Sequence, residues 1–201
     1  MGTDSIKMRL TEGTTVLVRP WRDEDESRLP ASLREMAWPL GYLKFFAPTF
    51  PVFNEEQDLL REIEHKNQQV WVALQPVEPA QPLLALGRLI RLEEPALGEI
   101  DVAVEKQYQR RGLGRLLTAM LYFVAQTEDL RALHVIVKSK NQMVIDWLQR
   151  LGASSQLFRD EIAELDWPVY PEARLFPPND SSRHFQLALD QIKEACNTRT
   201  E

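Results

Sequence analysis

The pattern of apolar and polar positions predicts strands in the first half of the chain and alternating strands and helices in the second. Short β-branched or apolar runs bounded by proline, glycine or charged residues are typical of strands. Leu113, Leu116, Leu117, Met120 and Val124 recur at helical spacing and predict a helix from about residue 112 to 128. The predicted strands are 14–20, 70–74, 83–92, 100–104 and 133–137, with one or two more in 155–167.

Capping residues and apolar spacing predict further helices. We expect one over 23–36, one that begins after Asn54, one between Asn141 and Gly152, and an amphipathic one near the C-terminus that includes Cys196. The segment 38–53 is aromatic and interrupted by prolines, which fits neither a helix nor a strand. The order of elements predicts a mixed α/β domain with helices packed on a sheet.

Composition and charge narrow the class of protein. The chain has 201 residues, the size of one domain, and carries a net charge of −6, which argues against broad nucleic-acid binding. Its single cysteine, Cys196, excludes an internal disulfide or a cysteine-based zinc cluster, and we expect it to be a small core residue. No apolar run approaches the roughly 18 residues of a membrane span, and the first twenty residues lack a signal-peptide pattern. We therefore expect a cytoplasmic protein without membrane or metal partners.

One basic window departs from this acidic average. Residues 106–115 contain four basic side chains and no acid, and Gly112 and Gly114 lie where a strand meets the helix. The first turn of a helix presents unpaired N–H groups and a partial positive charge, and glycines let an anion approach them. The window therefore suggests a phosphate or diphosphate site, although glycines and arginines at this place could also simply cap a solvated helix.

Two common phosphate loops do not fit this window. The Walker pattern requires Gly-Lys-Ser/Thr, and the dinucleotide fingerprint requires a third glycine where Leu117 stands. The pattern that remains is Gln109-Arg110-Arg111-Gly112-Leu113-Gly114, a Q-x-x-G-x-G sequence.

The residues around this pattern extend it. They are VAVE at 102–105, Tyr108, QRRGLGRLL, HVIVKSKN and IDWLQRLGA, and together they resemble the core of the GNAT superfamily of N-acyltransferases over 98–153. Ala153 stands where the family usually has an aromatic residue. VLVRPWRDED near the start, YLKFF at 42–46 and the absence of tyrosine between Asn141 and Gly152 resemble the bacterial protein-lysine acetyltransferase branch.

The resemblance implies a fold and an activity. The fold would be a mostly antiparallel twisted sheet of six to seven strands flanked by about four helices, formed by residues 1–170. Residues 171–201 would form a linker and a C-terminal amphipathic helix that packs on this domain or on a partner subunit. The activity would be direct transfer of an acyl group from acetyl-CoA to a primary amine, either a protein lysine or a small amine. The alternatives are a non-catalytic domain that binds or senses CoA, and a domain that binds another diphosphate nucleotide.

The resemblance also assigns the cofactor-binding residues. The diphosphate would lie on the backbone of Arg110–Arg115, with help from arginine side chains, and Lys106 could meet the ribose phosphate. The pantetheine arm would bind the backbone of a strand as an added strand does. Asn141 would reach that arm, although it could equally be a plain helix N-cap. The full set is Val102, Ala103, Val104, Gln109, Arg110, Arg111, Gly112, Leu113, Gly114, Arg115 and Asn141.

The chemistry requires a base for the amine. The resemblance favours Glu99, with Asp101 in reserve because it shares that face of the strand, and Glu105 is less favoured. The tyrosine that many family members use as general acid is replaced by Leu148. Either the thiolate leaves unprotonated, or Tyr108 or Tyr122 protonates it. Aromatic side chains at Tyr42, Phe45 and Phe46 are either walls of the acceptor site or core residues, and His134 is predicted to be a core residue.

Overall fold

The fold is organised around one sheet in which two groups of strands meet at a parallel pair. The computed structural model describes residues 5–10, 12–31, 33, 68–76, 81–92, 96–159 and 161–197. Within these residues the sheet has eight strands in the order β1-β2-β3-β4-β5-β6-β8-β7. Their bounds are β1 Ile6–Arg9, β2 Thr15–Pro20, β3 Gln68–Leu74, β4 Leu83–Arg91, β5 Leu97–Val104, β6 Ala132–Lys138, β7 Ser154–Arg159 and β8 Ile162–Pro168.

The mixed α/β fold predicted from the sequence is confirmed. Neighbouring strands pair antiparallel except β5 and β6, which pair parallel. A parallel pair needs a crossover connection, and helix α4 (Leu113–Thr127) provides it. The eighth strand is β1, which the apolar pattern did not predict because it has four residues. Its side chains are alternately buried and exposed, as expected of an edge strand with one face on the core.

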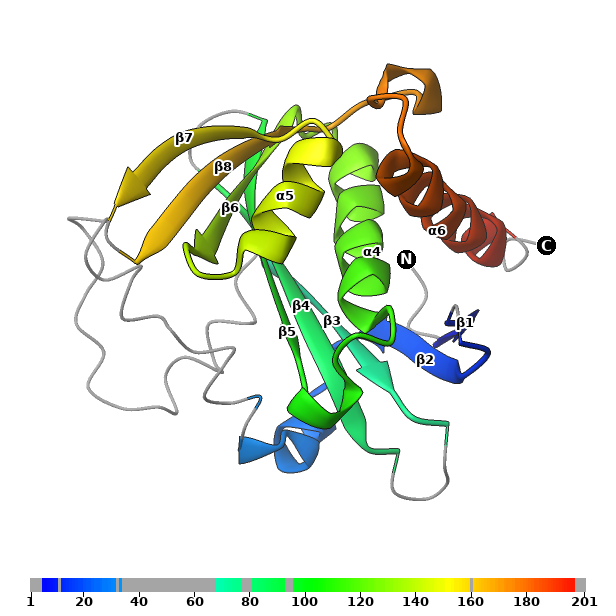
Figure 1. Ribbon diagram of the computed structural model, residues 1–201. Coiled ribbons are helices and arrows are strands. Elements are labelled where there is room, and N and C mark those ends of the chain that lie inside the picture. The colour runs from blue at the N-terminus through cyan, green and yellow to red at the C-terminus, as the bar shows by residue number, and fades with distance from the viewer. Residues whose placement is uncertain are drawn as a thin grey trace.

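Three helices cover one face of the sheet (Figure 1). They are α4, α5 (Gln142–Arg150) and α6 (Asp180–Asn197). Their apolar side chains form the main core with Ile100, Leu133, Val135 and Leu165 of the central strands. Helix α5 ends at Gly152 with a φ of +99°, where the amide of Ala153 reaches back to the carbonyl of Leu148. The predicted helices at 112–128, 141–151 and the C-terminus are therefore confirmed.

The C-terminal helix packs mainly on α4 and belongs to the same core. Phe185, Leu189 and Ile192 of α6 are buried, and Phe185 contacts the ring of Tyr122 edge-on with centroids 5.4 Å apart. Cys196 is half-buried against this core, in agreement with its predicted role as a small apolar residue.

The opposite face carries a smaller core beneath a short helix. The 3₁₀ helix η1 (Asp23–Arg28) replaces the first part of the helix expected over 23–36, and residue 32 and residues 34–36 lie outside the described part of the chain. Leu29 ends η1 in an extended conformation because Pro30 follows and disfavours the helical conformation of the residue before it. Leu17, Leu29, Leu33, Val72 and Leu86 are among the apolar residues buried on this face.

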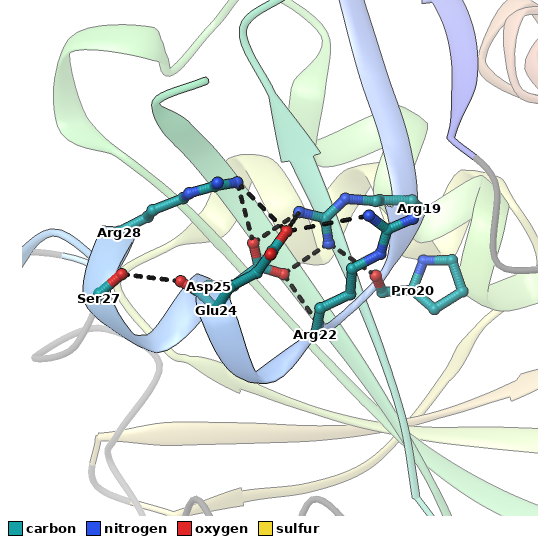
Figure 2. A network of polar contacts seen from close by, with 7 residues as sticks. All are labelled: Arg19, Pro20, Arg22, Glu24, Asp25, Ser27 and Arg28. Carbon is teal, nitrogen blue, oxygen red and sulfur yellow. Dashed lines mark hydrogen bonds and ion pairs between the residues drawn. The ribbon is translucent and has the colours of Figure 1, made fainter. Parts of the chain in front are cut away.

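A buried ion pair fastens η1 to the sheet (Figure 2). Arg19 of β2 donates two hydrogen bonds of 2.6 Å to the carboxylate of Asp25, and both residues are almost fully buried. Asp25 also accepts a hydrogen bond from the backbone N–H of Arg22 at 2.9 Å. Two charges buried together are stable only when they satisfy each other in this way, so the pair fixes where the chain leaves β2.

Candidate functional site

The central feature of the site is the separation of β5 from β6. The parallel pairing runs from Leu97 opposite Ala132 to Ile100 opposite Val135 and stops there. Strand β5 continues beside β4 as far as Val104, and β6 continues beside β8 as far as Lys138. The facing edges of 101–104 and 136–138 are therefore not paired with each other, and Figure 1 shows the two groups of strands diverging. Such edges expose backbone groups that an extended ligand can bind.

The basic glycine loop lies at the end of β5, next to this opening. Gly112 is the N-cap of α4 with a φ of +93°, a conformation that suits glycine. No carbonyl of the described residues accepts a hydrogen bond from the backbone N–H of Leu113 or Gly114. A Cβ on Gly114 would meet the side chain of Val104 at 3.7 Å, so the space beside this amide is open up to the strand. The helix N-terminus thus presents unpaired donors beside the opening, as an anion requires.

Side chains of the loop are held in different ways. The amide of Gln109 donates to the carbonyl of Val104 at 3.0 Å and ties the loop to the strand end. The guanidinium of Arg111 lies over the ring of Tyr108 at 5.5 Å, and that of Arg110 contacts the sulfur of Met143 at 2.9 Å. Arg110 and Arg111 are exposed. The loop therefore keeps two cationic groups at the surface next to the unpaired amides.

The side chains of β5 divide between two environments. Val102 and Val104 pack against the helix-covered core, so only their backbone is available to a ligand. Glu99, Asp101 and Ala103 project from the opposite face, because side chains alternate along a strand. Ala103 is buried in the smaller core, whereas Glu99 and Asp101 are half-buried.

Charged side chains from four strands surround Glu99. Arg88 of β4 lies opposite Asp101 with 3.9 Å between their charged atoms, and His134 of β6 lies opposite Glu99. Asp166 and Glu164 of β8 lie beside His134. The Nδ1 atom of His134 is 2.9 Å from Oδ1 of Asp166. Burial raises the pKa of Glu99, while Arg88 and His134 oppose this and Asp101 adds to it. Burial also raises the pKa of Asp101, opposed mainly by Arg88.

The prediction that His134 is a core residue is wrong. Leu133 and Val135 on either side of it are buried in the core, which is why the segment has the pattern of a buried strand. His134 itself lies on the face of the sheet that carries Glu99 and Asp101, and about a fifth of its side chain is exposed.

Comparison with known proteins fits this arrangement. The profile of the Acetyltransferase (GNAT) family matches residues 32–153, which is more than half of the chain. The chain belongs to the GNAT acetyltransferase family. It is accordingly an acyl-CoA-dependent N-acyltransferase whose donor is acetyl-CoA.

Individual proteins resemble it at low sequence identity. "Acetyltransferase PA5475" of Pseudomonas aeruginosa is 23% identical over 156 residues, which cover 78% of this chain and 84% of that protein. The GNAT domain of PAT from S. lividans superposes with a TM-score of 0.63 at 22% identity, covering 82% of this chain and 96% of that one. A cAMP-binding acyltransferase from Mycobacterium smegmatis gives 0.59 at 20% identity, covering 96% of this chain and 56% of its own.

Asn141 and the tyrosines can now be placed against the GNAT expectations. Asn141 is the N-cap of α5, and its side chain makes no capping hydrogen bond and is exposed. Tyr122 is fully buried, donates to the carbonyl of Pro168 and accepts from the N–H of Tyr170, and burial raises its pKa. The Tyr122 hydroxyl is therefore bonded to backbone groups inside the core. Tyr108 is half-exposed in the loop, in η3 (Lys106–Tyr108).

The remaining expectations concern Leu148, the aromatic segment, and metal or membrane features. Leu148, at the position of the usual acid, is buried in α5. Tyr42, Phe45 and Phe46, and the helix expected after Asn54, lie outside the described residues. Among the described residues, no three His, Cys, Asp or Glu side chains could hold a metal ion, and no helix is long and apolar enough to cross a bilayer.

Proposed function

We propose that this GNAT enzyme acetylates lysine side chains of proteins, with Glu99 as the general base. The observation that carries the proposal is the position of Glu99, one residue before the last β5–β6 pair and on the face away from the helices. A thioester arm bound between the parted strands would bring its acyl carbon close to this point. The described residues fit such an arm, because strand edges and unpaired helix amides lie next to each other at the opening.

An amine acceptor requires a base at neutral pH. The ordinary pKa of lysine is about 10.4, so only a few parts in ten thousand are neutral at pH 7. Burial raises the pKa of Glu99 and makes its carboxylate a stronger proton acceptor than an exposed glutamate. Acetyl-CoA supplies an activated acyl thioester, and the protein supplies the position and the proton acceptor. Asp101 is two residues away on the same face and is the reserve base.

The donor would be bound mainly by backbone groups. In this proposal the first-turn amides of α4 hold the diphosphate, Arg110 and Arg111 add positive charge, and the backbone of 102–104 binds the pantetheine arm as an added strand. Asn141 is available for the same arm, since its side chain does not cap α5.

In this proposal no side chain of the protein protonates the leaving thiolate. Leu148 cannot donate a proton, and the Tyr122 hydroxyl is hydrogen-bonded to backbone groups in the helix-covered core. A thiol has an ordinary pKa of about 8.5, so its anion is a tolerable leaving group near neutral pH.

The sheet face that carries Glu99, which we call the acceptor face, has a charge that supports a cationic acceptor. Four carboxylates from β5 and β8 project from this face beside one arginine and one histidine: Glu99, Asp101, Glu164 and Asp166. A lysine side chain approaching Glu99 would be attracted by this excess of negative charge.

The test is a thiol-release assay with lysine peptides and with small amines of equal charge. We expect Glu99→Gln to lower kcat by about 10²- to 10⁴-fold with an unchanged KM for acetyl-CoA. The loss should shrink toward pH 10, where the amine becomes neutral without help. Glu172→Gln, which removes an exposed carboxylate that pairs with Arg174, is the matched control. Full turnover of Glu99→Gln would remove Glu99 from the mechanism, and CoA binding without thiol release on any amine would favour a non-catalytic sensor.

A further inference from the structure

His134 occupies a place on the acceptor face that packing does not explain. It is the residue of β6 directly opposite Glu99, and neighbouring strands lie only about 4.8 Å apart. The residues before and after it contribute to the core, whereas the imidazole lies on the polar face and is partly exposed.

A carboxylate fixes the orientation of the imidazole. His134 Nδ1 is 2.9 Å from Asp166 Oδ1, and a carboxylate can only accept, so Nδ1 donates. The neutral ring then has its free lone pair on Nε2. Nε2 makes no hydrogen bond to any described residue, and the Glu164 carboxylate is 4.0 Å from it. Asp166 thus holds the ring in the tautomer that can receive a proton.

Charged groups from three neighbouring strands face the ring. The titratable and charged groups that face it come from each strand of this region: Glu99 and Asp101 of β5, Arg88 of β4, and Glu164 and Asp166 of β8. Two of these carboxylates contact His134 within 4.0 Å, and Arg88 lies beyond β5. Carboxylates therefore lie on both sides of the ring, with Glu99 on β5 and with Glu164 and Asp166 on β8.

The transfer reaction produces a proton that must leave the site. The acceptor ammonium first gives one proton to Glu99. The amine nitrogen then forms a bond to the acyl carbon, the carbon–sulfur bond breaks with its electron pair on sulfur, and the nitrogen loses its second proton. The thiolate takes up one proton, so one is released to solvent per turnover. Glu99 must lose its proton before the next cycle, and it is half-buried.

We propose that His134 is a positioning residue for proton release: held by Asp166, it receives the proton from Glu99 through a bridging water and passes it to solvent. The proposal rests on Glu99 as the base. A water between the two side chains is the expected carrier, because neither an ion pair nor a direct hydrogen bond joins them.

The experiment compares His134→Gln with His184→Gln, which alters an exposed histidine of α6. In weak buffer we expect His134→Gln to lower kcat about ten-fold or more without changing KM for acetyl-CoA. Added imidazole at constant pH should restore its turnover, because a small base can then take the proton. Wild type and His184→Gln should not respond, and thermal unfolding should confirm that both variants are folded.

The outcomes separate this proposal from the assignment of the base. A kcat of His134→Gln within two-fold of wild type, or a loss that imidazole does not restore while Glu99→Gln is inactive, overturns the role of His134 alone. Full turnover of Glu99→Gln overturns the base and the release path together. Should His134→Gln fail to fold, Asp166→Asn replaces it, and the same response to imidazole is required.

Discussion

Glu99 and His134 lie opposite each other on the parallel strands β5 and β6, one residue pair before these strands separate. Both side chains are therefore carried by backbone that is hydrogen-bonded on either side, since β4 pairs with β5 and β8 pairs with β6. Loops of the same length would leave such groups freer to move. The acceptor end of the site is thus built on the rigid part of the fold.

Glu99→Gln should stabilise the protein at alkaline pH. Burial raises the pKa of Glu99 above its ordinary 4.5, so the protonated form is favoured in the folded state. The stability linked to this group is fully present below pH 4.5 and is lost as the pH rises through the folded value. Glutamine is uncharged throughout, so the free energy of unfolding should exceed that of wild type at pH 8 and match it near pH 4. Urea titrations at the two pH values measure this, and an equal difference at both would contradict it.

Gly114→Ala should separate stability from donor binding. The added Cβ meets only Val104, at an ordinary contact distance of 3.7 Å, and alanine is favoured over glycine within a helix by about 1 kcal/mol. We expect an unchanged or slightly higher melting temperature. The methyl group would, however, occupy the space through which the diphosphate approaches the amides, so the Kd for CoA by calorimetry should rise about ten-fold or more. Unchanged affinity would place the diphosphate elsewhere.

Asp25→Ala should destabilise the protein by about 3–5 kcal/mol, because it leaves the Arg19 guanidinium buried without its partner. Chemical unfolding measures the loss. Glu24→Ala is the matched control: Glu24 is more than half exposed and its nearest cation is 3.8 Å away, so a change within about 0.5 kcal/mol is expected. Equal effects of the two substitutions would show that the buried pair contributes no more than the exposed one.

Tyr122→Phe should affect stability and not catalysis. The hydroxyl bridges the Pro168 carbonyl and the Tyr170 N–H, and their loss should cost about 1–3 kcal/mol. Unfolding midpoints measure that cost, and thiol release under folding conditions should proceed at the wild-type kcat. A selective loss of kcat without loss of stability would reinstate Tyr122 as an acid.

The helix after the glycine loop and the helix after β6 were predictable because their sequences combine apolar spacing with defined ends. The α4 pattern runs over three turns, and Gly152 marks the end of α5 through its left-handed conformation. The four-residue strand β1 carries too few positions for a pattern to stand out. For η1, the acidic residues suggested the start of a helix, but Asp25 binds Arg19 and Pro30 follows closely, and residues 23–28 form a 3₁₀ helix.

The sequence by itself determined the family, the donor and the loop proposed to hold it, because residues 106–115 are local and their glycines and charges act through adjacent backbone. The tertiary structure decided which charges gather around Glu99. Arg88, His134 and Asp166 come from three further strands, and a strand's pattern alone does not say which residues of another strand lie opposite. Their alignment follows from the register and from the point at which β5 and β6 separate, and hydrogen bonds between segments far apart in the chain set both.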